Sequence, residues 1–255
     1  MCGRYTLTSA PEVLRALFGY AGQPNFPPRY NIAPTQPIAV VRIREGQREF
    51  ALVRWGFLPS WVKDPKAFTL LINARGESVI DKPAFRAAMK RRRCLIPADG
   101  FYEWQKAGER KRPHFVRARS GGPFAFAGLW ETWTGPNGEE LETAAIVTTR
   151  ANRTLGVIHE RMPVIVPPDA FDLWLDTANV DATTVAALIA PAREDLLEAH
   201  EISTAVNRVA NDNPGLIEPL ATDAPPQPVA PAKRATPKRP AKKVDKKDKG
   251  QGVLF

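Results

Sequence analysis

The sequence predicts a mixed α+β fold with a curled sheet or barrel at its centre and a few helices at its periphery. Many short apolar segments are typical of strands, and strands and helices do not alternate as they do in βαβ units. A length of 255 residues, with 44% hydrophobic and 25% charged residues, favours one main domain over residues 1–220. Residues 221–255 are rich in Pro, Ala and Lys and almost lack large apolar side chains, so we expect a disordered tail there.

The first expected helix depends on a capping pattern. Ser9 and Glu12 have the spacing of a capping box, which predicts a short helix through Phe18. Its expected apolar face comprises Val13, Leu14 and Leu17. Four prolines between positions 24 and 34 then predict a loop with a fixed course.

Apolar patterns and turn residues define the remaining elements. A polar turn at 45–47 joins two paired strands, 38–43 and 50–55. The apolar run 70–72 ends in polar residues, and such a strand end often presents side chains to a site. Further strands are expected at 114–117, 124–129, 141–148, 164–166 and 202–206, and further helices at 83–90, 169–175, 183–189 and 194–199.

The positive charge is concentrated in the tail. The formal net charge is +9, and residues 221–255 carry nine Lys or Arg against three Asp. The preceding part is only mildly basic, so any affinity for DNA there must come from clustered cations.

Cysteine content and the missing motifs exclude several function classes. Cys2 and Cys94 imply no disulfide framework and fit a reducing compartment. We find neither a signal peptide nor a long apolar run, and therefore expect a soluble, cytoplasmic protein without a membrane partner. The cysteines and histidines lack metal-ligand spacing, and glycine-rich nucleotide-binding motifs are missing, so we expect no metal and no cofactor.

Cys2 follows the initiator methionine directly. A small side chain at this position permits removal of Met1, which would leave an α-amine and a thiol on the same residue. The amine can condense with an aldehyde to an imine, and the thiol can then close a five-membered thiazolidine ring. Taken alone, Cys2 is better explained as a chance cysteine that packs as a small hydrophobe, so its assignment depends on the rest of the chain.

Four other residues are candidates for site chemistry. Glu103 lies among aromatic residues, where a carboxyl group either has a raised pKa suited to proton transfer or faces solvent. Asn73 and Arg75 would point the same way from a strand, although a capped strand end with a surface arginine gives the same pattern. His159 is a candidate as well, but a lone histidine is more often structural.

Six ordered blocks extend over roughly residues 2–220 at ordinary loop spacings. They are Met1-Cys2-Gly3-Arg4-Tyr5, Tyr30-Asn31-Ile32-Ala33-Pro34, Trp55-Gly56, Ile72-Asn73-Ala74-Arg75-Gly76-Glu77, Pro97-Ala98-Asp99-Gly100-Phe101-Tyr102-Glu103-Trp104 and His159-Glu160-Arg161-Met162-Pro163. Together they resemble the SOS response-associated peptidase (SRAP) family of abasic-site processing proteins.

The resemblance implies a protein that binds single-stranded DNA and captures abasic sites, whose ring-opened sugar presents an aldehyde. We also expect a monomer. The resemblance assigns the nucleophile to Cys2, the holding of the amino group to Asn73, proton transfer to Glu103, and sugar chemistry with slow reversal of the crosslink to His159. An α-amine with a reference pKa of about 7.7–8.0 is partly neutral at cellular pH, so positioning and proton transfer matter more than a strong base.

The resemblance also implies which residues contact DNA. Arg4, Arg75 and Arg161 would neutralise phosphates, Thr148 would form a hydrogen bond, and Trp61 would stack on a base. Where the family often has aromatic or acidic residues after this tryptophan, the chain has Val-Lys-Asp at 62–64, which departs from the pattern that supports stacking.

Other functions stay open at this point. The same N-terminus suits an N-terminal nucleophile peptidase, including one that removes its own Met1, and a lyase-like activity at abasic sites is compatible with imine chemistry. A non-catalytic binder of single-stranded DNA would not need Cys2 at all.

The end of the tail breaks the Lys/Pro/Ala composition. Gln251, Leu254 and Phe255 resemble the short peptide by which bacterial proteins bind the replicative sliding clamp, although the second position of the peptide is Gly252. Adjacent large apolar residues in a disordered segment favour an external pocket, while a chance match is the alternative.

Overall fold

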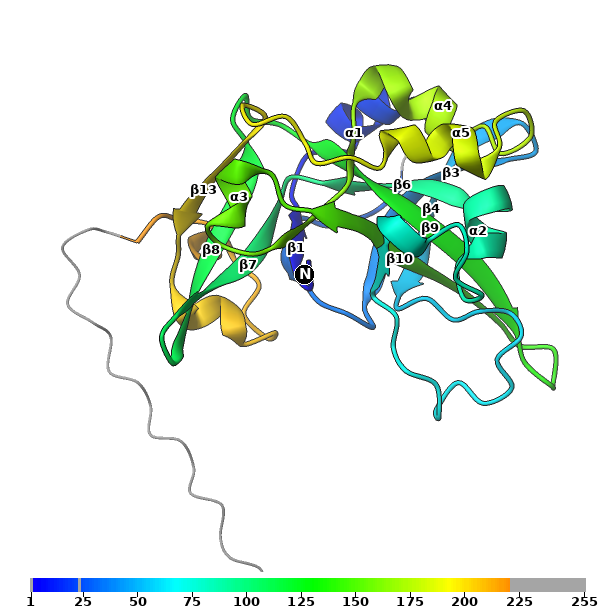
Figure 1. The fold of residues 1–255 in the computed structure, drawn as a ribbon, viewed down its shortest axis with the longest axis horizontal. Coiled ribbons are helices and arrows are strands. Elements are labelled where there is room, and N and C mark those ends of the chain that lie inside the picture. The colour runs from blue at the N-terminus through cyan, green and yellow to red at the C-terminus, as the bar shows by residue number, and fades with distance from the viewer. Residues whose placement is uncertain (1, 23, 221–255) are drawn as a thin grey trace, which may run out of the picture. The chain divides into compact units, whose positions relative to one another are not determined.

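The computed structural model describes residues 2–22 and 24–220 (Figure 1). The expectations for Met1 and for the tail, including Gln251, Leu254 and Phe255, lie outside the described residues. In the part of the chain that the structure covers, no helix is long and apolar enough to cross a membrane.

Five strands close into a barrel. They follow the order β3 (Pro37–Arg44), β4 (Gln47–Trp55), β10 (Glu140–Arg150), β9 (Phe124–Thr134), β6 (Arg93–Ala98) and back to β3. All pairs are antiparallel except β4 with β10. The predicted α+β fold with a barrel core is therefore confirmed.

Three short strands extend the barrel sheet. β5 (Asn73–Arg75) and β11 (Arg161–Pro163) both pair with β10, and β12 (Ile165–Val166) pairs with β9.

The second sheet places the N-terminal strand in its interior. Its order is β13 (Leu197–Glu201), β8 (Arg110–Ala118), β7 (Gly100–Ala107), β1 (Tyr5–Leu7) and β2 (Arg29–Ile32). Figure 1 shows β1 in dark blue beside β7, with its neighbours drawn from distant parts of the sequence. Because β1 has a partner on each side, the residues just before it are held against the second sheet, while Asn73 of β5 donates a hydrogen bond to the Cys2 carbonyl.

The helices are short. They are α1 (Pro11–Phe18), α2 (Arg86–Arg91), α3 (Arg153–Gly156), α4 (Phe171–Leu175) and α5 (Ala182–Val185), with 3₁₀ turns at Gly76–Ser78, Pro168–Ala170, Ala186–Leu188, Thr204–Asn207 and Pro214–Leu216.

The capping box at the first helix is not formed, although the helix ends at Phe18 as predicted. Ala10 occupies the N-cap position without a side-chain hydrogen bond, and the hydroxyl of Ser9 donates to the carboxylate of Asp99. Val13 is 48% exposed, so the buried face of α1 is narrower than expected.

Two predictions near the C-terminal end of the domain are wrong. The segment 194–199, expected to be a helix, contains most of strand β13, and 202–206, expected to be a strand, contributes to the 3₁₀ turn Thr204–Asn207. Glu194 accepts hydrogen bonds from the N–H groups of Arg153 and Thr154 at the start of α3 instead of opening a helix of its own. Pairing with the edge of β8 then decides the conformation of β13.

Two further local predictions need correction. The proline-rich stretch 24–34 contains strand β2 because Arg29–Ile32 can pair with β1. The strand expected at 70–72 instead comprises Asn73–Arg75, in which Ala74 is buried, and it pairs in parallel with β10. Asn73 and Arg75 therefore belong to the strand itself.

Candidate functional site

Cys2 is fixed in a fully buried position at the entry to β1. In the β1–β7 register Tyr5 faces Phe101, and the N–H of Tyr102 donates to the carbonyl of Arg4 at 3.0 Å. Continuing this antiparallel register brings the start of the chain alongside Glu103. From the opposite side, Nδ2 of Asn73 donates to the carbonyl oxygen of Cys2 at 2.9 Å.

Burial controls the protonation of Cys2 and Glu103. Burial raises the pKa of the Cys2 thiol well above its usual range, and the charge of Glu103 raises it further. The thiol therefore stays protonated at neutral pH. Burial also raises the pKa of the Glu103 carboxyl group to about 6, close to the value that suits proton exchange in a cell.

Asn73 has a second polar atom available. Its Oδ1 is buried and has no hydrogen-bond partner among the described residues. An amide oxygen accepts hydrogen bonds, so Oδ1 of Asn73 is suited to accept one from an N–H group of Cys2. The pairing of β5 with β10, in which Asn73 lies opposite Ile146, fixes the orientation of this amide.

The tautomer of His159 follows from one backbone contact. The N–H of Arg161 donates to Nδ1 of His159 at 3.0 Å, so Nδ1 carries a lone pair and the neutral ring carries its proton on Nε2. Burial lowers the pKa of His159, which favours this neutral form. The ring is thus prepared to donate through Nε2.

Arg161 and Thr148 form one connected group. Nη2 of Arg161 donates to the carbonyl oxygen of Thr148 at 2.8 Å and lies 3.3 Å from its Oγ1. Both Nη atoms also donate to the carboxylate of Glu77, at 3.0 and 2.8 Å. Thr148 lies between Arg75 of β5 and Pro163 of β11 in the strand pairings, so Arg75, Thr148 and Arg161 gather at the same end of β10.

The other expected DNA-contacting residues have different surroundings. Arg4 is partly buried, and its Nη1 donates to Oδ1 of Asn31 at 2.7 Å and to the carbonyl of Val206 at 2.9 Å. Arg75 is exposed. Trp61 is 59% exposed and packs edge-on against Phe68 at a centroid distance of 5.8 Å, in the loop before β5.

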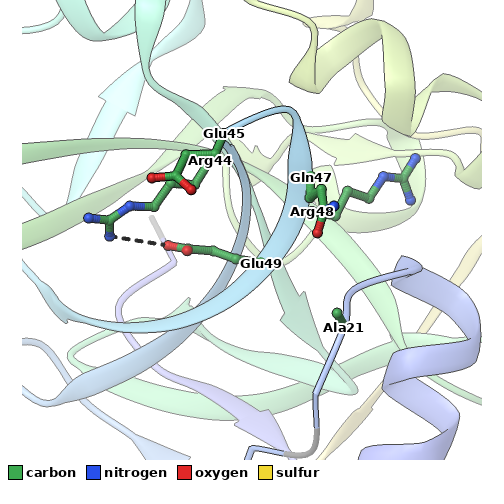
Figure 2. A pocket seen from close by; sticks show the side chains of 6 residues that line it. All are labelled: Ala21, Arg44, Glu45, Gln47, Arg48 and Glu49. Atoms are coloured by element: carbon green, nitrogen blue, oxygen red, sulfur yellow. Dashed lines mark ion pairs between the residues drawn. The ribbon is translucent and has the colours of Figure 1, made fainter.

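One surface hollow is unrelated to these residues. It measures about 360 Å³ and lies at the turn between β3 and β4, where Figure 2 shows Arg44 and Glu49 as an ion pair at 3.8 Å. No expected site residue lines it, and among the described residues no cluster of His, Cys, Asp and Glu could hold a metal ion.

Residues 1–209 match the family described as SOS response associated peptidase (SRAP). The chain belongs to this family. Two of its relatives are the abasic site processing protein YoqW of Bacillus subtilis, 38% identical over 86% of this chain and 99% of that protein, and YedK of Escherichia coli, 31% identical over 86% and 100%. The abasic site processing protein HMCES of Gallus gallus is 31% identical over 88% of this chain and 80% of that protein.

Solved structures show the same fold. A crystal structure of a protein from Bacteroides thetaiotaomicron superposes with a TM-score of 0.79 at 23% identity, covering 86% of this chain and 100% of that one. A second, from Bordetella bronchiseptica, gives a TM-score of 0.70 at 26% identity, covering 79% and 100%.

In this SRAP chain the sequence motifs contain two residues whose roles emerge only from the structure. Asn31 orients Arg4 and also donates through Nδ2 to the carbonyl of Asn211 at 2.7 Å. Glu77 is paired with Arg161. Both residues lie within the family blocks, and their place in these blocks was the only feature of the sequence that could have indicated a role. The residue types themselves do not reveal which partners they bind.

Proposed function

We propose that this SRAP protein processes abasic sites in single-stranded DNA and captures them covalently through Cys2 after removal of Met1. The main support is the arrangement around Cys2: a buried thiol, an amide that holds the Cys2 backbone, and a carboxyl group with a pKa of about 6 beside it. The names of the relatives, which are abasic site processing proteins, point to the same substrate.

The proposed reaction has three steps. Hydrolysis of the Met1–Cys2 peptide bond consumes one water and exposes the α-amine. The amine adds to the C1′ aldehyde of the ring-opened deoxyribose, and loss of one water gives an imine. The thiol then adds to the imine carbon while its proton passes to nitrogen, which closes the thiazolidine ring without any redox change.

Protonation in the site agrees with this order. A thiol with a strongly raised pKa is a poor initial nucleophile, so the amine attacks first and the thiol closes the ring onto the more reactive imine. Glu103 moves protons among the amine, the departing water and the imine nitrogen. His159 donates from Nε2 to the sugar oxygen and assists reversal of the crosslink.

DNA binding would use the surface around this site. Arg4, Arg75 and Arg161 neutralise phosphates, Thr148 adds a hydrogen bond, and Trp61 offers an exposed ring for stacking. We also propose that the protein acts in the cytoplasm at the nucleoid, where this substrate arises, and that it acts as a monomer.

A denaturing gel tests the proposal. Purified protein lacking Met1 is mixed with an abasic single-stranded oligonucleotide and denatured before loading. We expect a shifted adduct with the wild type and with C94A, which removes the other buried cysteine, and no adduct with C2A. Intact oligonucleotide should still bind to C2A, because the phosphate contacts lie elsewhere. An undiminished adduct from C2A, or from protein with a blocked N-terminus, would refute the mechanism.

The same experiment separates the other activities. Peptide turnover that requires Cys2, without an adduct, would identify a peptidase. Strand cleavage without a lasting adduct would identify a lyase, and reversible binding indifferent to Cys2 would identify a simple binding protein.

The tail extends the proposal to a replication partner. We propose that Gln251, Leu254 and Phe255 bind the replicative sliding clamp, and that the basic segment 233–249 is a tether with added attraction for DNA. A peptide of residues 245–255 is titrated against the clamp beside a control in which Leu254 and Phe255 are alanine. Equal, weak binding by both peptides would exclude the clamp as partner.

A further inference from the structure

Arg161 is held by two kinds of partner. The carboxylate of Glu77 accepts from Nη1 at 3.0 Å and from Nη2 at 2.8 Å, in a two-pronged ion pair. The backbone carbonyl of Thr148 accepts from Nη2 at 2.8 Å. The carboxylate neutralises the guanidinium charge, whereas the carbonyl only fixes its position.

The pair lies partly open to solvent. The side chain of Glu77 is 45% exposed and that of Arg161 is 12% exposed. A carboxylate and a phosphate present the same pair of acceptor oxygens to a guanidinium group. An incoming phosphate can therefore take the place of Glu77 without moving Arg161, because Thr148 keeps the guanidinium in position.

The three arginines expected to contact DNA differ in whether a carboxylate neutralises their charge. Arg4 donates to an amide oxygen and a backbone carbonyl, and both of these groups are neutral. Arg75 is exposed and has no ion pair within 4.0 Å among the described residues. Among these three, Arg161 is the one with a carboxylate partner.

We propose that Glu77 occupies the phosphate site of Arg161 in the free protein and is displaced by the DNA backbone on binding. The inference rests on the proposed binding of single-stranded DNA. While the pair is intact, Glu77 neutralises Arg161, so DNA that places no phosphate there gains nothing from this cation. DNA that does place a phosphate there must first displace the carboxylate. The low pKa of Glu77, caused mainly by the hydrogen bonds from Arg161, agrees with a firmly held pair.

The test measures reversible binding of an intact, labelled oligonucleotide by fluorescence anisotropy between 50 and 200 mM salt. For E77Q we expect a Kd lower by about two- to fivefold, the ratio that an exposed ion pair contributes. The log–log salt dependence should steepen by about 0.7, because one more uncompensated cation meets a phosphate. The matched control is E160Q, which removes an exposed carboxylate at the neighbouring position and should change the slope far less.

A double variant tests whether Glu77 acts through Arg161. In R161Q protein the E77Q substitution should no longer tighten binding. A gain that persists in R161Q, or an E77Q protein whose Kd and slope match the wild type, would overturn the inference while leaving DNA binding itself intact. Wild-type protein that binds no oligonucleotide would refute the proposed function as well. If E77Q fails to fold, E77D serves instead: its shorter side chain should also tighten binding, and an unchanged Kd would count against the inference.

Discussion

The pH dependence of adduct formation gives the sharpest test of the role of Glu103. Burial raises the pKa of its carboxyl group to about 6, and the α-amine of a mature Cys2 has a reference pKa of about 7.7–8.0. Imine formation requires a neutral amine that can attack and an acid that can protonate the departing water. The Glu103 carboxyl group and the α-amine must therefore carry one proton between them. That singly protonated state dominates between the two pKa values.

The expected magnitudes follow from these values. In the wild type the singly protonated population varies by only about twofold between pH 6 and pH 8. Below pH 6 the rate should fall about tenfold per pH unit, because Glu103 and the amine are then both protonated. In E103Q the rate follows the neutral amine alone, which decreases about fortyfold from pH 8 to pH 6.

The assay is the initial rate of adduct formation with an abasic oligonucleotide at subsaturating concentration, from pH 5 to pH 9. E109Q is the control, because Glu109 is an exposed carboxylate in the turn between β7 and β8, and its profile should match the wild type. An E103Q profile that runs parallel to the wild-type profile across pH 6–8 would refute the assignment of proton transfer to Glu103.

Four further predictions address other parts of the protein. N73A should slow adduct formation by about three- to tenfold, the effect of one lost hydrogen bond, and an unchanged rate would remove Asn73 from the site. H159Q should slow reversal of a purified adduct more than its formation, and equal effects on both would contradict a separate role. R75Q should flatten the salt dependence of single-strand binding by about 0.7 in log–log slope, and an unchanged slope would make Arg75 structural. Arg93 is buried and donates to the carbonyls of residues 89, 174, 176 and 180. In denaturant titrations R93M should therefore lower the free energy of unfolding by at least about 3 kcal/mol. The control R91M, at an exposed position, should change it by less than about 0.5 kcal/mol.

Local sequence patterns were sufficient where short-range chemistry controls structure. The β3–β4 hairpin follows from two apolar strands and a polar turn, and its turn residues Glu45 and Gly46 adopt positive φ angles of 52° and 78°. In the segment 194–199 the local pattern was misleading: it predicts a helix, but residues 197–199 form part of β13 because they pair with β8. Pairing with a distant strand supplies hydrogen bonds and burial that no window of a few residues contains.

Composition and ordered motifs were enough to predict the α+β class, the family and the residue types available for chemistry. The environments of these residues emerged only with the folded structure. It buried Cys2 beside Glu103, brought Asn73 to the Cys2 carbonyl, and paired Arg161 with Glu77. Desolvation and ion pairing depend on neighbours that are far apart in the chain, so protonation states and charge compensation cannot be assigned until the strands are placed side by side.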